Sequence, residues 1–449
     1  MNLNNDFEVR TRALFGEERY SRFVSALGEE PVVSVRANNR KPFSSFDGVE
    51  VPWAAEGCYL PSRPVFTADP LFHAGCYYVQ EASSMFLEQV VKQYVDGAVR
   101  ALDLCAAPGG KTTHLLSLLP QGSMLVSNEP VPARAQVLAE NVVKWGHPSA
   151  MVTRNEPADF SPFRNFFDLI VVDAPCSGEG MFRKDEGAVT EWSRENVEAC
   201  VVRQRKILQD AWDALRPGGV LIYSTCTFNP WENEDNVSWI VETLGADVLD
   251  VVIDPSWGIT VGNPGYHFYP HKTRGEGFYL CALRKHTVGF APVRPLSQRL
   301  PKYKPSPAQP VEGRDIMRTW LQHPDQWVMR QQDRFVVAYP AKYKEFIELL
   351  NKQFICISTG FGLGEIRGKS FVPQHALAMA KELRKEAFTQ VELTLEQALS
   401  YLRTEALQLT DAPVDVLLVT YQHIPLGFVK SVGNRCNNLY PKEWRIRKL

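Results

Sequence analysis

Between residues 100 and 226, short apolar runs alternate with stretches of helical periodicity. The runs cover residues 101–105, 124–127, 151–153, 169–173 and 220–225. Such alternation is typical of a mostly parallel sheet covered by helices on both faces. The fourth run is apolar at consecutive positions, as expected of a strand that is buried on both sides. We therefore predict a doubly wound, mostly parallel α/β domain.

Further units are expected on either side of this domain, because 449 residues exceed the usual size of one domain. Prolines alternate with basic residues between 285 and 310, which indicates an extended linker. Beyond it we predict helices over 376–385 and 395–407 and a strand over 416–420. The predicted units are an N-terminal subdomain, the α/β domain, the linker, an α+β connecting domain and a terminal domain, over residues 1–70, 71–285, 286–312, 313–390 and 391–449.

The composition is that of an ordinary globular protein, with 45% hydrophobic and 22% charged residues. The formal charge of −2 points neither to nor away from nucleic acid. Nine cysteines without a regular pairing pattern indicate a reducing compartment rather than a disulfide framework. No window approaches the ~18 apolar residues of a membrane helix. We expect a soluble, cytoplasmic protein without a membrane partner, and the sequence does not specify its oligomeric state.

A glycine-rich turn follows the first run, in Leu104–Thr112 (Leu-Cys-Ala-Ala-Pro-Gly-Gly-Lys-Thr). Gly109 and Gly110 allow a ligand to approach the backbone at a helix N-terminus, where free N–H groups favour negative charge. A phosphate-binding loop would need glycine at Cys105, and the G-x-G-x-x-G dinucleotide pattern is missing. S-adenosylmethionine is the third ligand to consider, with Glu129 placed to bind its ribose hydroxyls. A turn that only packs a helix on a strand is the alternative.

Two cysteines stand where two later strands are predicted to end. Cys176 lies in the segment Asp-Ala-Pro-Cys-Ser-Gly, and Cys226 lies in Ser-Thr-Cys-Thr. Because ligands of open α/β sheets bind outside the C-terminal ends of the strands, we expect both thiols in one crevice with the glycine turn. Burial as small apolar side chains is the alternative. The chain lacks a C-x-x-C or nearby histidine pair that would favour zinc, and we predict no metal site.

A thiol beside a methyl donor suits methylation of a pyrimidine at carbon 5. That carbon becomes nucleophilic only after a thiolate has added to carbon 6, and a base must later remove the carbon-5 proton so that the thiol can leave. An ordinary thiol, with a pKa of about 8.5, is mostly protonated at neutral pH, so the site must activate it. Asp173 is placed to hydrogen-bond the polar edge of the base while charge develops.

These motifs resemble those of the NOP2/Sun family of RNA (cytosine-5) methyltransferases, most closely its bacterial branch of small-subunit ribosomal RNA methyltransferase F-like proteins. The resemblance covers nearly the whole chain and rests on four segments in the same order. They are Gly75–Ser84, Leu104–Thr112, Asp173–Met181 and Ser224–Thr227 with Glu232-Asn-Glu234 after it. The resemblance implies a Rossmann-like class I methyltransferase domain, a small N-terminal substrate-binding subdomain and a C-terminal α+β region with a PUA-like RNA-binding module.

The resemblance also implies roles for single residues. Cys226 is the expected nucleophile and Cys176 the expected aid to product release, whereas DNA cytosine-5 methyltransferases attack with the Pro-Cys thiol. Glu156 stands where the family commonly has aspartate near the adenine, and Asp159 is its alternative. The expected contacts to S-adenosylmethionine come from Cys105, Ala106, Ala107, Pro108, Gly109, Gly110, Lys111, Glu129, Arg134, Glu156 and Asp173.

The last twenty residues hold six Lys or Arg against one Glu. Aromatic residues interleaved with these cations suit base stacking together with phosphate neutralisation. A solvated terminal strand whose aromatic residues belong to the core is the alternative. The predicted RNA contacts are Arg435, Tyr440, Lys442, Trp444, Arg445 and Arg447, and the linker cations Arg294, Arg299, Lys302 and Lys304 extend the positive track.

The sequence thus predicts an S-adenosylmethionine-dependent enzyme that methylates carbon 5 of a cytosine in RNA, with small-subunit ribosomal RNA as the expected partner. An amino-group methyltransferase is the first alternative, but it would show Asn/Asp-Pro-Pro-Tyr/Phe where this chain has Asp173-Ala-Pro-Cys. A non-catalytic RNA-binding assembly factor is the second, and it would have no need of two cysteines at strand ends.

Overall fold

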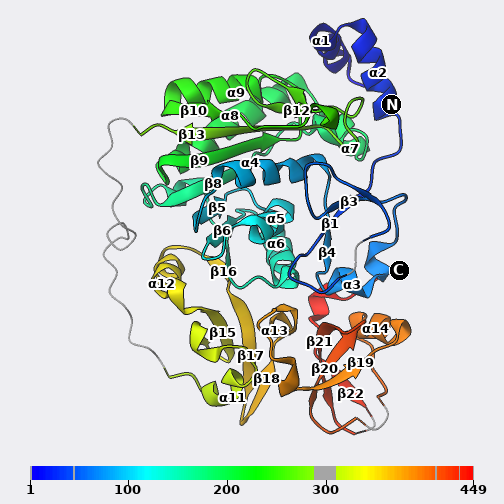
Figure 1. Ribbon diagram of the computed structural model, residues 1–449, viewed down its shortest axis with the longest axis vertical. Helices are drawn as coiled ribbons and strands as arrows, with labels where there is room; N and C mark the ends of the chain where they lie inside the picture. The colour runs from blue at the N-terminus through cyan, green and yellow to red at the C-terminus, as the bar shows by residue number, and fades with distance from the viewer. Residues whose placement is uncertain (1–2, 44–45, 288–309, 410–411, 434, 448–449) are drawn as a thin grey trace.

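The computed structural model describes residues 3–43, 46–287, 310–409, 412–433 and 435–447. A large central sheet occupies the middle and upper part of the view, and two smaller sheets lie beside each other below it (Figure 1). Two helices at the N-terminus lie at the upper edge of the large sheet. None of the described helices combines the length and apolar character needed to cross a membrane.

The N-terminal unit consists of a helix pair and a small antiparallel sheet. Helices α1 (Asn5–Phe15) and α2 (Glu17–Leu27) pack through buried aromatic residues against the central domain. The sheet has the order β2-β3-β1-β4. Strand β4 belongs to this sheet, since Val79 pairs with Val35 of β1. The N-terminal sheet therefore extends past residue 70, where we expected the subdomain to end. The strands are β1 (Ser34–Ala37), β2 (Val49–Glu50), β3 (Gly57–Tyr59) and β4 (Tyr77–Val79), and the short helix α3 (Pro70–His73) precedes β4.

The central sheet has the order β11-β12-β13-β9-β8-β5-β6-β7-β16, with β10 paired to β13. Each apolar run predicted from the sequence is one of its parallel strands, within a few residues at the ends. These are β5 (Arg100–Asp103), β6 (Met124–Asn128), β7 (Ala150–Thr153), β8 (Phe167–Asp173) and β9 (Leu215–Thr225). The antiparallel part comprises β10 (Ala246–Leu249), β11 (Thr260–Val261), β12 (Tyr266–Phe268) and β13 (Phe278–Lys285).

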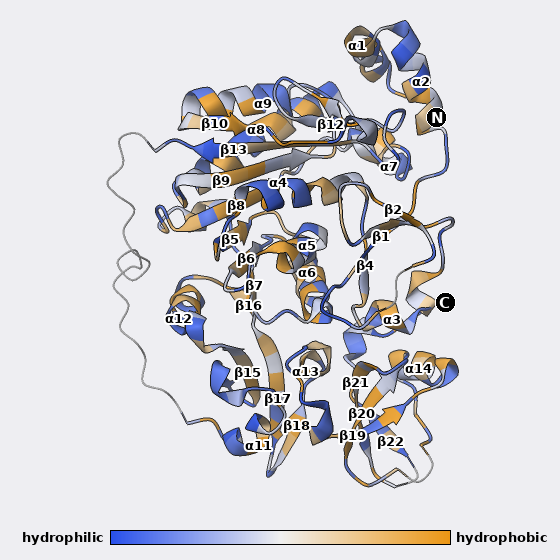
Figure 2. Cartoon of the chain, in the orientation of Figure 1, coloured by the Kyte–Doolittle hydropathy of each residue, from blue (hydrophilic) through white to orange (hydrophobic). Residues whose placement is uncertain are grey.

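Helices cover both faces of this sheet, as predicted. One face packs against α4 (Leu87–Tyr94), α5 (Gly110–Leu118) and α6 (Pro132–Trp145). The other packs against α8 (Arg194–Trp212) and α9 (Glu234–Trp239). The short α7 (Glu186–Glu191) packs in the cluster that holds the N-terminal helix pair. Apolar and polar residues stand side by side on α8 and α9, the pattern of helices with one buried side (Figure 2).

The connecting region contributes a strand to the central sheet, which the sequence did not indicate. Strand β16 (Cys356–Thr359) pairs antiparallel with β7, and α12 (Lys344–Gln353) buries Phe346 and Leu350 in the core beneath that edge. The region also forms its own sheet, β14-β15-β17-β18. Its remaining elements are α11 (Arg314–Arg318), β14 (Trp327–Gln332), β15 (Phe335–Pro340), β17 (Phe361–Arg367) and β18 (Ser370–Pro373).

The C-terminal domain is a four-stranded sheet with two short helices. The strand predicted over 416–420 is β20, and the helices predicted over 376–385 and 395–407 are shorter than expected. The second helix begins with a capping box between Thr394 and Gln397 and ends at Leu402. The elements are α13 (His375–Met379), β19 (Thr389–Glu392), α14 (Leu395–Leu402), β20 (Val416–Tyr421), β21 (Ile424–Ser431) and β22 (Cys436–Asn438).

Candidate active site

The predicted site residues of the central domain lie at one edge of its sheet. Cys105, Glu129, Glu156, Asp173 and Cys226 lie at or just beyond the C-terminal ends of β5, β6, β7, β8 and β9 respectively. Because parallel strands end at the same edge, the fold brings these residues together from five separate segments of the chain.

The glycine turn between β5 and α5 is held by α6. The Ala107–Pro108 peptide bond is cis, and Gly109 has the left-handed φ of 112°. Asn141 Nδ2 donates to the Pro108 carbonyl at 2.8 Å, and Arg134 Nη2 donates to the Ala107 carbonyl at 3.0 Å. A Cβ on Gly109 would lie 3.3 Å from a side-chain carbon of α6. Gly109 therefore serves close helix packing as well as the turn that opens α5.

Two acidic positions follow the next strands of the sheet. Glu129 is buried, and its carboxylate accepts from the Val131 N–H at 3.0 Å and lies 3.3 Å from Arg134 Nη1. Glu156 is exposed beyond β7. Asp159 Oδ2 accepts from the Glu156 N–H at 3.0 Å, so Asp159 closes the local turn. The side chains of Glu156 and Asp159 are both exposed, and the two residues form a capping box with each other.

Asp103, the last residue of β5, is a further carboxylate that the sequence analysis did not single out. It is fully buried, and Thr112 Oγ1 donates to its Oδ2 at 2.6 Å. Its Oδ1 has no hydrogen-bond partner among the described residues. Burial raises the pKa of Asp103 to about 7. An unpaired buried acceptor beside a helix N-terminus fits a ligand that carries both an ammonium and a carboxylate group.

The thiols of Cys176 and Cys226 lie together at this edge, as the sequence predicted. Their sulfur atoms are 3.1 Å apart without a disulfide bond, and the Cys226 N–H donates to Cys176 Sγ at 3.3 Å. Both side chains are partly exposed. The contact with Cys226 and burial raise the pKa of Cys176. The described part of the chain has no group of three or more His, Cys, Asp or Glu that could hold a metal ion.

Asp173 and Lys111 connect the cysteine edge to the glycine turn. Lys111 Nζ lies 2.8 Å from Asp173 Oδ2, and Ser224 Oγ donates to Asp173 Oδ1 at 2.8 Å. The Asp173 side chain is 37% exposed, whereas the Lys111 side chain is 11% exposed. The Asp173 carboxylate is thus held by two partners, and part of it remains exposed to solvent.

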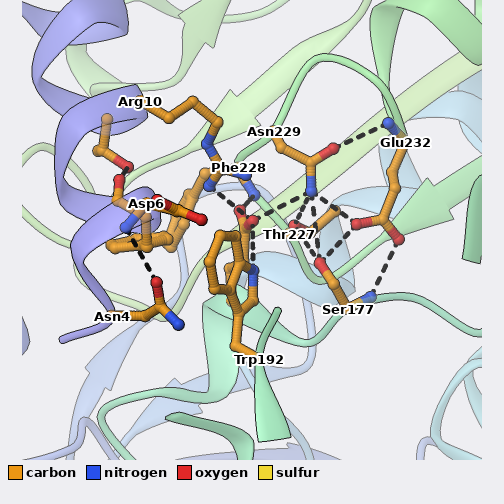
Figure 3. Close-up of polar contacts among 12 residues, drawn as sticks. Asn4, Asp6, Arg10, Ser177, Trp192, Thr227, Phe228, Asn229 and Glu232 are labelled. Atoms are coloured by element: carbon orange, nitrogen blue, oxygen red, sulfur yellow. Dashed lines mark hydrogen bonds and ion pairs between the residues drawn. The ribbon is translucent and has the colours of Figure 1, made fainter. Parts of the chain in front are cut away.

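A buried carboxylate, Glu232, links the two cysteine loops; Figure 3 shows it beside Ser177 and Asn229. It accepts from the Ser177 N–H at 2.9 Å, from Gln204 Nε2 at 2.8 Å and from Asn229 Nδ2 at 2.6 Å. Burial raises the pKa of Glu232. Because Ser177 follows Cys176 and Asn229 follows Cys226 by three residues, this network fixes the two loops relative to each other.

A second buried carboxylate, Glu179, ties the same loops to helix α1. It accepts from Arg10 Nη2 at 2.6 Å, from Trp192 Nε1 at 3.0 Å and from the Phe228 N–H at 2.8 Å. Figure 3 shows Arg10 reaching from α1 toward Trp192 and Phe228. Glu179 and Glu232 lie within or next to the motifs that the sequence analysis quoted, so their carboxylates were available as a signal. Arg10 is far away along the chain and carried none.

The predicted RNA-binding residues of the tail divide into exposed and buried side chains. Arg435, Lys442, Arg445 and Arg447 are exposed, and Trp444 is partly exposed. The prediction that Tyr440 offers a stacking surface is wrong, because its side chain is 3% exposed and its ring packs edge-on against core aromatic residues. The linker cations Arg294, Arg299, Lys302 and Lys304 lie outside the described residues.

Comparison with known proteins identifies the family. Residues 93–284 match the family model "16S rRNA methyltransferase RsmB/F", residues 3–82 the N-terminal domain of 16S rRNA methyltransferase RsmF, and residues 388–446 the methyltransferase RsmF PUA domain. Ribosomal RNA small subunit methyltransferase F of Cronobacter sakazakii is 32% identical over 420 residues, which span 88% of this chain and 84% of that protein. The protein of the same name from Escherichia coli O127:H6 is 33% identical over 421 residues with the same coverage. This chain belongs to the 16S rRNA methyltransferase RsmB/F family.

Family membership confirms the resemblance and the predicted architecture, including the PUA-like terminal domain. Solved structures agree on the fold. NSun6 from Pyrococcus horikoshii with SFG has a TM-score of 0.54 and 22% identity, covering 63% of this chain and 98% of that one. A methyltransferase homologue from the same organism has a TM-score of 0.52 and 24% identity, covering 63% and 100%. The matched family ranges leave residues 285–387 between them.

Proposed function

We propose that the chain transfers a methyl group from S-adenosylmethionine to carbon 5 of a cytosine in small-subunit ribosomal RNA. The proposal depends on the 3.1 Å contact between the partly exposed thiols of Cys176 and Cys226 at the C-terminal edge of the sheet. An amino-group methyltransferase and a non-catalytic assembly factor would need neither thiol. The names of the relatives support ribosomal RNA as the substrate class.

The residues around the glycine turn fit the donor. The unpaired Oδ1 of Asp103 suits its ammonium group, the α5 N-terminus suits its carboxylate, and Glu129 suits its ribose hydroxyls. S-adenosylmethionine, when bound, supplies an electrophilic methyl group. Glu156, exposed beyond β7, is the residue we assign to the adenine end.

Cys226 is the proposed nucleophile. The Cys226 thiol loses its proton to solvent, and its sulfur then bonds to carbon 6 of the cytosine, which makes the ring enamine-like at carbon 5. Asp173, fixed by Lys111 and Ser224, holds the polar edge of the base. The side chains of Cys226 and Asp173 are both partly exposed, as access by an unstacked base requires.

Cys176 assists release. An ordinary thiol is mostly protonated at neutral pH. Cys176 lies 3.1 Å from Cys226, so it passes its own proton to the departing Cys226 sulfur as the carbon–sulfur bond breaks. In the same step the Cys176 sulfur takes the proton from carbon 5. The ring regains its aromatic character, and both cysteines end as thiols.

The proposal is tested by incubating the protein with small-subunit ribosomal RNA and a donor that carries a labelled methyl group. Wild type and a Cys58→Ser control, which changes another partly exposed cysteine, are expected to place the label on carbon 5 of cytosine, read by bisulfite sequencing. Cys226→Ser is expected to transfer none. Label on an amino nitrogen, or undiminished transfer by Cys226→Ser, would refute the proposal.

A further inference from the structure

A second hollow lies away from the two cysteines, between the connecting sheet and the end of the chain. We call it the C-terminal groove; it encloses about 970 Å³, at the upper end of the roughly 300–1,000 Å³ of typical ligand sites. One wall comes from β15, β16, β17 and β18, and the other from residues 437–444. It therefore joins the region that no matched family range covers to the PUA-like domain.

The rim of the C-terminal groove carries aromatic and cationic side chains. Phe335 is 39% exposed although it is a large apolar residue, and the Arg334 guanidinium lies 5.0 Å from the centre of its ring. Trp444 is partly exposed on the opposite wall. Arg367 and Lys442 also line the groove, together with the carboxylates Glu365 and Glu443. Glu365 pairs with both Arg334 and Arg367, at 3.2 and 2.7 Å. Exposed aromatic rings next to cations are the usual platform for unpaired bases and their phosphates.

The same lining holds buried polar atoms that have no partner within the described chain. These are both ring nitrogens of His375, which is 7% exposed, the hydroxyl of Tyr440 and Nδ2 of Asn351. Burial lowers the pKa of His375 to about 3, so its ring is neutral, with one donor and one acceptor. Leaving such groups unpaired destabilises a fold, so their presence together points to a polar ligand.

Part of the groove lining lies close to the edge of the central sheet that carries the cysteines. Cys356, in its lining, pairs with Thr153 at the C-terminal end of β7. In the strand order β9-β8-β5-β6-β7, four spacings separate β7 from Cys226, roughly 19 Å at about 4.8 Å each. Nucleotides in the groove would therefore flank the target base rather than be the target.

We propose that the C-terminal groove binds an unpaired segment of the RNA substrate, with a base stacked on Phe335 and a phosphate on Lys442. Arg334 and Arg367, which share Glu365 as a partner, add positive charge to the same rim. This inference rests on the proposed function for the identity of the substrate. It assigns RNA binding to the connecting sheet as well as to the PUA-like domain.

Binding is measured by fluorescence anisotropy with a labelled unpaired RNA oligonucleotide and a hairpin of the same composition. Phe335→Ala is expected to weaken binding of the unpaired RNA by roughly 5- to 150-fold, the range for loss of one base–aromatic stack. Leu395→Ala, which removes a 49% exposed apolar side chain of α14 outside the groove, is the control and should change binding less than about twofold. Equal affinities of wild type and Phe335→Ala would overturn the proposal.

The cation is tested by salt dependence. Lys442→Ala is expected to lower the slope of log affinity against log salt by about 0.7, as one lost contact to a single strand would. Lys381→Ala, an exposed lysine outside the groove lining, should leave the slope unchanged. Equal slopes for wild type and Lys442→Ala would contradict the phosphate contact.

The buried polar atoms give an independent test. Tyr440→Phe removes a hydroxyl that has no partner among the residues the structure describes, so Tm should stay the same or rise while RNA binding weakens. In the control Tyr401→Phe, the lost hydroxyl donates to the Phe428 carbonyl at 3.2 Å, so Tm should fall while binding stays the same. A lower Tm with unchanged RNA binding in Tyr440→Phe would show that this hydroxyl serves the fold. These binding assays need no methyl transfer, so their failure is distinct from failure of the proposed chemistry.

Discussion

Replacement of Arg10 by methionine is expected to destabilise the protein and to slow methyl transfer, although Arg10 belongs to the N-terminal helix pair. The Arg10 side chain is 15% exposed and its partner Glu179 is fully buried, with 2.6 Å between Nη2 and Oε1. Breaking a buried pair leaves an uncompensated charge and costs about 3–5 kcal/mol. Because Glu179 keeps three uncharged N–H donors, from Trp192, Phe228 and Asn229, we expect a smaller loss, about 2–3 kcal/mol.

The effect on activity follows from what Glu179 holds. It binds the Phe228 N–H, two residues after Cys226, and its neighbour Gly180 donates to the Cys226 carbonyl at 2.8 Å. A loosened Glu179 therefore releases both cysteine loops. The lower kcat should be partly restored in Arg10→Lys, which keeps the charge but loses the fork of donors.

The assay is urea unfolding together with initial rates of methyl transfer. The control is Arg12→Met, on the same helix, because Arg12 pairs with the largely exposed Glu17 and such surface pairs contribute only about 0–1 kcal/mol. A loss below about 0.5 kcal/mol in Arg10→Met, within the range of ordinary surface substitutions, or an unchanged kcat, would refute this account of Glu179.

Two further predictions concern the edge of the sheet. Asp103 has a folded-state pKa of about 7, above its unfolded value, so the free energy of unfolding without S-adenosylmethionine should fall as pH rises from 4 to 7. Asp103→Asn should flatten this dependence, measured by urea unfolding at each pH. Parallel pH profiles of wild type and variant would contradict the prediction. Gly180→Ala should cost about 1–3 kcal/mol and most activity, because the new Cβ would lie 2.3 Å from the Gly277 carbonyl oxygen. Gly187→Ala is the milder control, and equal effects of the two would count against this close contact.

The central domain could be predicted because its signals are local. Strands buried on both faces have consecutive apolar residues, as in β8. The rule that ligands bind at the C-terminal ends of strands predicted from the sequence that Cys176 and Cys226 lie together, which the structure shows. The glycine turn could also be located from its local sequence pattern. The packing of Gly109 against α6 could not, because the pattern does not show which helix lies next to the turn.

What the sequence did not reveal depends on distant pairing. Strand β16 pairs with β7 although the two are far apart along the chain. Next to this pairing, the Ile355 N–H donates to the side chain of Asn155, which lies 200 residues earlier. The contact of Arg10 with Glu179 spans 169 residues. Tyr440 was misassigned because a basic stretch with aromatic residues has the same composition whether its rings face RNA or, as here, the core.

The central claim, that Cys226 forms the bond to cytosine and Cys176 releases it, is tested most directly by trapping the adduct. Each variant is incubated with RNA and donor, denatured and resolved on a gel that separates protein from protein–RNA conjugates. Cys176→Ala is expected to accumulate a covalent RNA adduct, whereas Cys226→Ala and the double variant should form none. Adducts in Cys226→Ala and none in Cys176→Ala would reverse the two roles and contradict the account.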